Sequence, residues 1–151
     1  MKNVFCSCGI LLNKKNQTLI LSRKHKDFLK SYYEFPGGKV ENSENFYSAL
    51  SRELHEELAI NVQENNLRPF QFIQHRYSRF NLIMHSFIIR KWNGNISSSE
   101  NVNYKWINIK KLSEAKLLPG NKSLIKSIEN LLLFFQEHEI KISKLIFPFK
   151  V

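Results

Sequence analysis

Three glutamates in one short stretch have the spacing of a metal-binding helix. Residues 38–60 read glycine, five residues, glutamate, seven residues, then Arg-Glu-Leu-His-Glu-Glu-Leu-Ala-Ile. In an α-helix, Glu53, Glu56 and Glu57 stand at positions i, i+3 and i+4 and therefore share one face. Their mutual repulsion destabilises the helix unless cations lie among them, and hard divalent ions such as Mg²⁺ or Mn²⁺ prefer carboxylate oxygens. The pattern predicts a divalent-metal site on a helix that follows a glycine turn.

The same spacing resembles the Nudix box, in which glycine, five residues, glutamate and seven residues precede Arg-Glu-apolar-any-Glu-Glu-any-Gly-apolar. One position differs, because Ala59 stands where that family has glycine. If the family's glycine ends the helix in the left-handed conformation, alanine there costs about 1 kcal/mol and strains the helix end. Glu44 and Arg52 are expected to form an ion pair that fixes the box. The alternative interpretation of the stretch is a charged, solvent-facing helix.

Two further segments extend the resemblance, over about residues 4–133, to the MutT branch of the Nudix hydrolases. Residues 33–41 read Tyr-Glu-Phe-Pro-Gly-Gly-Lys-Val-Glu, and residues 118–121 read Leu-Pro-Gly-Asn, similar to that branch's base-reading segment. The resemblance implies a Nudix-type α/β/α sandwich with a mixed β-sheet between helices. It also implies Mg²⁺-dependent hydrolysis of a nucleoside triphosphate to the monophosphate and pyrophosphate. The branch's best-known substrate is 8-oxo-dGTP, a mutagenic product of nucleotide oxidation.

Phosphoryl chemistry explains why carboxylates are needed. Displacement at phosphorus requires metal ions that neutralise the phosphate chain and activate or orient water. Glu53, Glu56 and Glu57 can supply metal ligands. The resemblance adds the Gly37 carbonyl and Glu100, which falls in a loop where a further carboxylate is expected. Glu53 or Glu100 is the expected general base, and Glu56 completes the set of expected catalytic carboxylates.

Four other residues are candidates for substrate binding. Arg23 and Lys39 are expected to contact phosphates. Phe35 is expected either to pack against the base or to belong to the core. Asn121 has two interpretations: it is the N-cap of the last helix, or it reads the purine edge as the corresponding asparagine does in the MutT branch.

Two functions compete with hydrolysis of an oxidised purine. Close relatives of this branch hydrolyse cytidine or methylated cytidine triphosphates with the same box. A non-catalytic domain that binds nucleotides or RNA is the other alternative, which the basic charge and Ala59 favour. Such a domain has no need of the complete Arg-Glu-x-x-Glu-Glu set that this sequence retains.

Composition limits the possibilities less sharply. The 151 residues carry a formal charge of +10 with a pI of about 9.7, which favours anionic partners in general. The chain is expected to be one domain over residues 1–151, a monomer or weak dimer, with no stable nucleic-acid complex and no membrane-spanning segment. Cys6 and Cys8 are the only cysteines, and they are expected to be reduced core residues of a cytoplasmic protein.

The spacing of apolar residues predicts the elements that hold these side chains. The first two strands are expected to form a hairpin around a polar turn at 13–17. Helix 44–58 has an apolar stripe beside its glutamate face, so one flank can pack on a sheet while the other lines a cleft. A second helix begins near residue 121, and residues 139–151 form an apolar extension of undetermined role. The predicted strands are 4–12, 18–23, 32–35, 70–77, 82–92 and 104–109.

Overall fold

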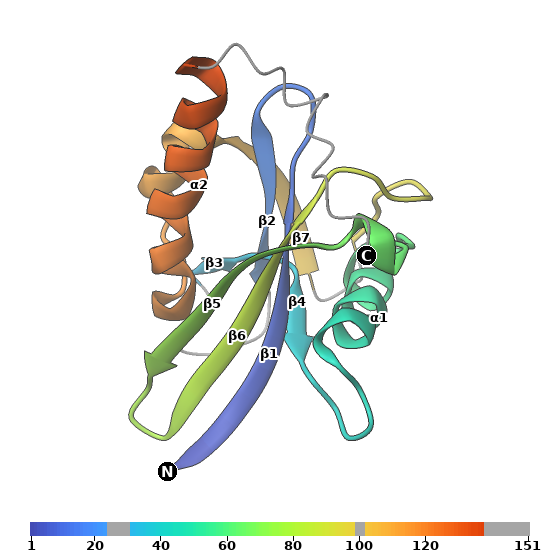
Figure 1. Cartoon of the computed structure of the whole chain (residues 1–151), viewed down its shortest axis with the longest axis vertical. Coiled ribbons are helices and arrows are strands. Elements are labelled where there is room, and N and C mark those ends of the chain that lie inside the picture. The colour runs from blue at the N-terminus through green and yellow to red at the C-terminus, as the bar shows by residue number, and fades with distance from the viewer. Residues whose placement is uncertain (24–30, 99–101, 138–151) are drawn as a thin grey trace.

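The computed structural model describes residues 1–23, 31–98 and 102–137, and Figure 1 shows how their elements are arranged. Within these ranges, two long helices lie on opposite sides of a layer of strands. Short 3₁₀ helices follow α1 and β7. The elements, in chain order, are β1 (Lys2–Leu11), β2 (Gln17–Arg23), β3 (Tyr33–Glu34), β4 (Gly37–Lys39), α1 (Phe46–Leu58), η1 (Glu64–Asn66), β5 (Arg68–Arg76), β6 (Phe80–Ile89), β7 (Val102–Asn108), η2 (Ile109–Glu114) and α2 (Pro119–Glu137).

The strands form two sheets. A four-stranded sheet has the order β4-β1-β6-β5, in which β1 and β6 run parallel and the other neighbours run antiparallel. A three-stranded antiparallel sheet has the order β3-β2-β7. The predicted mixed sheet is therefore confirmed, and a second sheet, which the sequence did not predict, accompanies it.

The predicted hairpin of the first two strands is wrong beyond its turn. The turn forms as expected, because the Asn13 N–H donates to the Gln17 carbonyl at 3.1 Å and the Asn13 side chain accepts from the Lys15 N–H at 2.9 Å. β1 and β2 then pair only at Leu12 and Thr18 and separate into different sheets. β4 pairs with β1 at residues 6–8, and β3 pairs with β2 at residues 21 and 22. The other edge of β1 is taken by β6 and that of β2 by β7, so the two strands meet only next to their turn.

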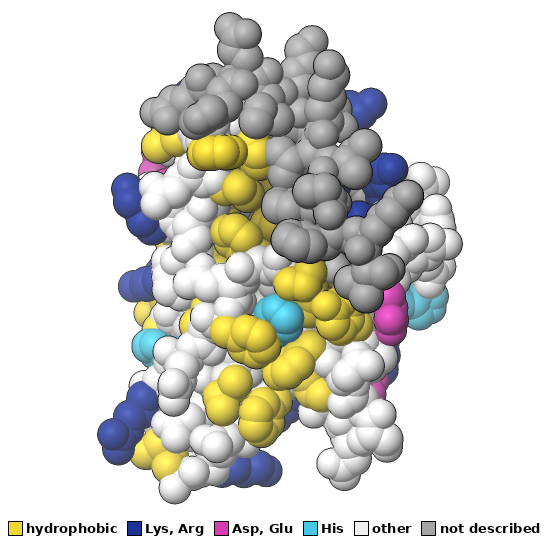
Figure 2. Space-filling view, in the orientation of Figure 1, with side chains coloured by type: hydrophobic (Ala, Val, Ile, Leu, Met, Phe, Trp, Pro, Cys, Tyr) yellow, Lys and Arg dark blue, Asp and Glu magenta, His cyan; other side chains and the backbone are white. Residues whose placement is uncertain are grey.

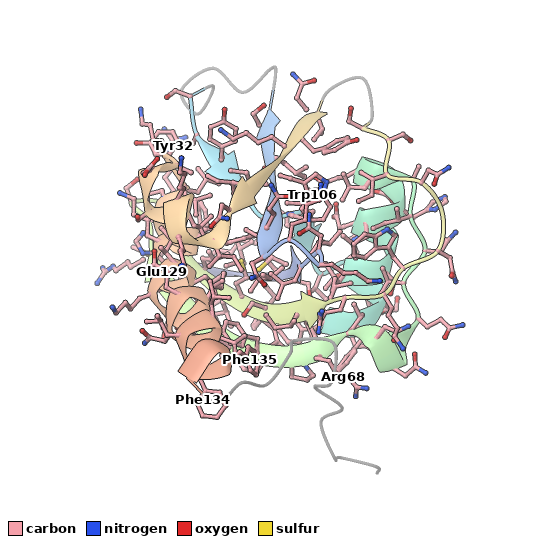
Figure 3. The ribbon with its side chains drawn as sticks, turned by 90° about the horizontal axis from the view of Figure 1, so that it is seen from above. Tyr32, Arg68, Trp106, Glu129, Phe134 and Phe135 are labelled. Atoms are coloured by element: carbon pink, nitrogen blue, oxygen red, sulfur yellow. The ribbon has the colours of Figure 1, made fainter. Side chains whose placement is uncertain are left out.

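The two helices cover opposite faces of the strands, as Figures 1 and 3 show. Successive residues of a strand point to opposite faces, so β1 directs Ile10 towards the α2 side and Leu11 towards the α1 side. This arrangement confirms the predicted α/β/α sandwich. The helix residues that anchor the two cores are Leu50, Leu54 and Leu58 in α1 and Leu124, Ile128 and Leu132 in α2.

The start of α1 is fixed by a capping box. The Asn45 side chain accepts from the N–H groups of Tyr47 and Ser48, both at 2.9 Å, and the Ser48 hydroxyl accepts from the Asn45 N–H at 3.0 Å. These bonds satisfy N–H groups that have no partner within the helix. The helix therefore begins at Phe46, two residues later than predicted.

Part of the α1-side sheet face remains open and aromatic. Figure 2 shows hydrophobic side chains gathered around a histidine on this side of the molecule. His85 stacks on Phe72 with 4.0 Å between the ring centroids, and Phe46 meets both rings edge-on at 5.6 Å. Phe72 is 60% exposed, and burial lowers the pKa of His85.

No helix in the described ranges combines the length and apolar character needed to span a membrane.

Candidate active site

Gly37 and Gly38, predicted as a turn, begin the strand β4, and this glycine segment meets the carboxylate helix α1 at Gly37. Its N–H donates to Glu57 Oε2 at 2.9 Å, and the Glu57 side chain is largely buried. Gly37 has φ +140°, and a Cβ there would collide with the backbone of Ser7 and Cys8 on the paired strand β1. Only glycine meets both conditions. The carboxylate at the buried end of the cluster is therefore tied directly to the backbone of the turn.

Gly38 lies against the carboxylate of Glu53. A Cβ at residue 38 would overlap the carboxyl group of Glu53. The absence of a side chain thus leaves room for this carboxylate directly beside β4. The backbone of the turn and two of the three glutamates predicted as metal ligands on the helix consequently form one assembly.

Arg52 holds the other end of the cluster. Its guanidinium binds both oxygens of Glu44, with Nε at 2.8 Å and Nη2 at 3.0 Å, and Nη1 lies 3.0 Å from Glu53 and 3.3 Å from Glu56. Nη2 also donates to the Lys39 carbonyl at 3.0 Å. Hydrogen bonds from Arg52 and from the Glu41 backbone lower the pKa of Glu44, while the bond to Glu44 raises that of Arg52. The predicted ion pair that fixes the box is confirmed.

Arg52 also offsets part of the repulsion between the glutamates on the helix face. It places one cation beside Glu53 and Glu56, which reduces their repulsion. No three acidic, histidine or cysteine side chains in the described ranges converge as a ready-made metal cage. The glutamate oxygens nevertheless suit Mg²⁺ chemically, and Glu56, whose side chain is 55% exposed, can turn towards an ion. The donor set fits a hard divalent cation, and the ligand assignment stays a prediction.

Asn121 joins the start of α2 to Phe35, the residue that follows the strand β3. Its Oδ1 accepts from the Phe35 N–H at 3.0 Å, and its Nδ2 lies 3.9 Å from Met84 Sδ. The N-cap interpretation is wrong, because α2 begins at Pro119 and Asn121 is already within its first turn. Asn121 is 6% exposed, so its carboxamide is held in one orientation by buried groups.

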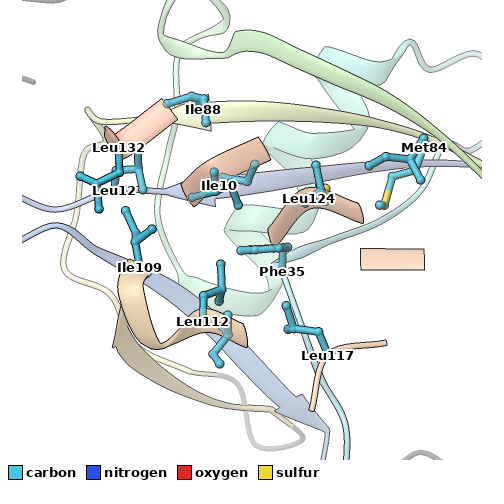
Figure 4. Packing of buried hydrophobic residues seen from close by; sticks show 14 of the residues in the cluster. Ile10, Leu12, Phe35, Met84, Ile88, Ile109, Leu112, Leu117, Leu124 and Leu132 are labelled. Carbon is cyan, nitrogen blue, oxygen red and sulfur yellow. The ribbon is translucent and has the colours of Figure 1, made fainter. Parts of the chain in front are cut away.

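Phe35 belongs to the core. It is 2% exposed, and Figure 4 shows it among Leu112, Leu117 and Leu124. Its backbone N–H, through the bond to Asn121, connects it to the candidate base-reading residue. Contact of the Phe35 ring with a nucleobase stays a prediction.

The other predicted residues are placed less completely. Lys39 is exposed at the end of β4, and its own backbone carbonyl accepts from Arg52. Arg23 ends β2, where it pairs with Val102, and its side chain lies outside the described part of the structure. Glu100 also lies outside the described residues. Neither Cys6 nor Cys8 forms a disulfide, and burial raises the pKa of Cys8, in agreement with its predicted place in the core.

One contact beside Asn121 was not predicted. The Tyr77 hydroxyl accepts from the Gly120 N–H at 3.0 Å. The sequence gives one indirect indication of this contact. Leu118 precedes the first helical residue, Pro119, and its side chain cannot accept from the first N–H groups of the helix, so another residue has to do so.

Comparison with known proteins identifies the assembly of turn, helix and ion pair. A family model described as NUDIX domain matches residues 7–127. The chain belongs to the Nudix family. The 8-oxo-dGTP diphosphatase of Buchnera aphidicola subsp. Schizaphis graminum is 33% identical over 134 residues, which cover 89% of this chain and 99% of the relative. The 8-oxo-dGTP diphosphatase of Buchnera aphidicola subsp. Acyrthosiphon pisum is 36% identical over 128 residues, which cover 83% of this chain and 98% of the relative.

Solved structures of other proteins share the fold. A MutT structure from a study of Aliivibrio salmonicida and Vibrio cholerae has a TM-score of 0.72 and 26% identity, covering 86% of this chain and 99% of that one. The Escherichia coli ORF135 protein has a TM-score of 0.76 and 24% identity, with 87% and 92% covered. The likeness to the second structure shows the fold alone.

The departure from the Nudix box has a structural consequence. Ala59, at the position of the box glycine, follows α1 with φ 56° and ψ 28°, and its N–H donates to the His55 carbonyl at 2.9 Å. This is the left-handed conformation that favours glycine, and an L-residue with a Cβ there costs about 1 kcal/mol. The left-handed helix end is therefore confirmed, and the strain that Ala59 brings to it stays a prediction. The carboxylates nevertheless keep their places in the preceding turns of α1.

Proposed function

We propose that this chain is a Mg²⁺-dependent Nudix hydrolase of the MutT type that converts 8-oxo-dGTP to 8-oxo-dGMP and pyrophosphate. The observation that carries the proposal is the assembly of Gly37, Gly38, Glu53 and Glu57, in which a glycine turn is bonded to one carboxylate and packed against another. The names of the two Buchnera relatives support the choice of substrate. Sanitation of the nucleotide pool fits a cytoplasmic location, where both thiols stay reduced.

The carboxylates and the turn would hold the metal. Glu53, Glu56 and Glu57, with the Gly37 carbonyl and Glu100, are the proposed ligands. Mg²⁺ bound there would neutralise the phosphate chain and lower the pKa of water. Arg52 keeps Glu53 and Glu56 oriented through its bonds at 3.0 and 3.3 Å. Glu53 or Glu100 takes the proton from the attacking water, and Arg23 and Lys39 contact the phosphates.

Asn121 is the proposed base-reading residue. One lone pair of its Oδ1 accepts the Phe35 N–H, and one N–H of Nδ2 is directed at Met84 Sδ, so one lone pair and one N–H are left for the base. Guanine has an acceptor at N7 and at O6, whereas oxidised guanine has an N–H at N7. A carboxamide that offers both an acceptor and a donor matches the oxidised edge. Mismatched polar contacts of this kind can discriminate by roughly 10⁴-fold.

A substrate screen tests the proposal. Purified protein with Mg²⁺ is given canonical, oxidised and methylated triphosphates, and pyrophosphate, phosphate and monophosphate are measured for each. We expect pyrophosphate and monophosphate as products, and a kcat/KM for 8-oxo-dGTP about 10²-fold or more above that for dGTP. Preference for a cytidine triphosphate would replace the substrate assignment, and binding without turnover would replace hydrolysis itself. Glu53→Gln, assayed in parallel, controls for contaminating phosphatases.

A further inference from the structure

Tyr77 lies where the turn between β5 and β6 meets the start of α2. Its N–H donates to the Phe80 carbonyl at 2.9 Å and closes that turn. Its ring stacks on Phe80, with 4.8 Å between the centroids and 27° between the planes, and meets His75 edge-on at 4.6 Å. Neighbours in the same hairpin therefore fix the ring, and the hydroxyl is held at a defined point.

The Tyr77 hydroxyl performs the task of a helix cap. The first N–H groups of a helix have no partner within the helix, and an N-cap side chain commonly accepts from one of them. Leu118 precedes α2 and has no acceptor, while Pro119 has no N–H to satisfy. The Gly120 N–H instead donates to Tyr77 at 3.0 Å. A residue from a distant part of the sequence thus supplies the acceptor that the helix lacks.

Glycine at residue 120 makes this close approach possible. A Cβ there would lie 2.6 Å from Leu82 Cδ2 and 3.0 Å from the Tyr77 hydroxyl oxygen. The next residue, Asn121, donates its N–H to the Leu118 carbonyl at 2.8 Å and accepts the Phe35 N–H through its side chain. The first turn of α2 is consequently held by the β5–β6 hairpin at residue 120 and by the strand segment before the glycine turn at residue 121.

We propose that Tyr77 is a positioning residue for base recognition, because its hydroxyl fixes the first turn of α2 and thereby the orientation in which the Asn121 carboxamide meets the nucleobase. The inference rests on the proposed function, in which Asn121 reads the base. Tyr77 acts through Asn121 and touches no reacting atom. Loss of its hydroxyl should therefore weaken nucleotide binding and leave the chemical step intact.

The hydroxyl stays protonated in the neutral pH range. Burial raises the pKa of Tyr77, and the Gly120 N–H opposes that shift in part. The contact with Gly120 is then a neutral hydrogen bond, and its removal in Tyr77→Phe changes no charge near the site.

The first measurement concerns the contact itself. Tyr77→Phe keeps the ring and its stacking on Phe80 and deletes only the oxygen. Hydrogen exchange of the Gly120 amide should accelerate by about five- to tenfold, the factor expected for one neutral hydrogen bond. Tyr104→Phe is the matched control, because its hydroxyl also bonds a backbone group, the Ile96 carbonyl at 3.4 Å. Unchanged exchange at Gly120 in Tyr77→Phe would overturn the proposal.

The second measurement separates positioning from general destabilisation. The substrate is whichever triphosphate the wild type hydrolyses with the highest kcat/KM, so a wrong base assignment appears in the wild-type preference and not in the variants. Tyr77→Phe should raise KM about five- to tenfold with kcat within about twofold, while Tyr104→Phe changes neither. In an Asn121→Ala background the KM effect of Tyr77→Phe should disappear, because both changes act through one group. An equal KM effect in both backgrounds, or a loss confined to kcat, would overturn the proposal.

Discussion

The Glu57 carboxylate accepts the Gly37 N–H at 2.9 Å, across 20 residues of sequence. This bond joins the strand β4 to the last turn of α1, so the turn and the helix can reach their working geometry only together. The same pair of elements is joined again by Arg52, which donates to the Lys39 carbonyl. The carboxylate cluster is thus held in place by bonds between β4 and α1, and a substitution in either element should alter the geometry of the other.

Substitutions at the two glycines should have different effects. Gly38→Ala places a methyl group against the Glu53 carboxyl, a side chain that can rotate away, so the fold should survive while kcat falls by about 10²-fold. Gly37→Ala places a methyl group against the backbone of Ser7 and Cys8, at a φ of +140° that L-residues rarely adopt. Because a paired backbone cannot move aside as a side chain can, this variant should have the lower melting temperature. Thermal melting and steady-state kinetics check this. Equal melting temperatures for the two variants would contradict the assignment of separate roles.

Glu53→Gln keeps the size of the side chain and removes its charge and basicity. It should lower kcat by roughly 10² to 10⁴-fold with the fold intact, as judged by circular dichroism. Glu100→Gln is the comparison that assigns the general base. A loss confined to Glu100→Gln would move the base there, and near-normal kcat in both variants would show that neither residue has the role.

Ala59→Gly should stabilise the protein. The residue has φ 56°, and a glycine there avoids a cost of about 1 kcal/mol, equivalent to a rise of about 2–4 °C in the melting temperature for a chain of this size. Ala49→Gly, within the same helix, is the control with the opposite sign, because glycine in a helix interior costs about 1 kcal/mol. A melting temperature that falls in Ala59→Gly would show that the left-handed conformation carries no strain.

Asn121→Asp should impair recognition of the base. Asp retains an acceptor for the Phe35 N–H but loses the Nδ2 donor and brings a charge to a site that is 6% exposed. Binding of the oxidised nucleotide should weaken by roughly 1 to 3 kcal/mol, measured as kcat/KM for 8-oxo-dGTP and dGTP. Asn45→Asp is the control, since Asp caps α1 as well as Asn does. If Asn121→Asp matches the wild type on both substrates, the base assignment loses its main support.

The sequence predicted those features that depend only on residues close together in the chain, such as the shared helix face and the ion pair. The i, i+3, i+4 spacing placed Glu53, Glu56 and Glu57 on one helix face, and the box spacing paired Glu44 with Arg52. The polar turn after β1 was also predicted, but the partner of β1 was not, because strand pairing depends on which edges distant strands occupy. The start of α2 at Pro119 could have been predicted, since proline is favoured at the first helical position. The Tyr77 contact with Gly120 could not, because it joins residues 43 positions apart.

Dependence on a divalent cation tests the central claim most directly. Pyrophosphate release from the preferred triphosphate is measured as Mg²⁺ is titrated into protein freed of metal with EDTA, together with the melting temperature at each concentration. Turnover should be abolished in excess chelator and return with Mg²⁺ or Mn²⁺. The melting temperature should rise over the same range, because binding to the folded state stabilises it. Hydrolysis that continues unchanged in excess chelator would contradict the assignment of Glu53, Glu56 and Glu57 as metal ligands.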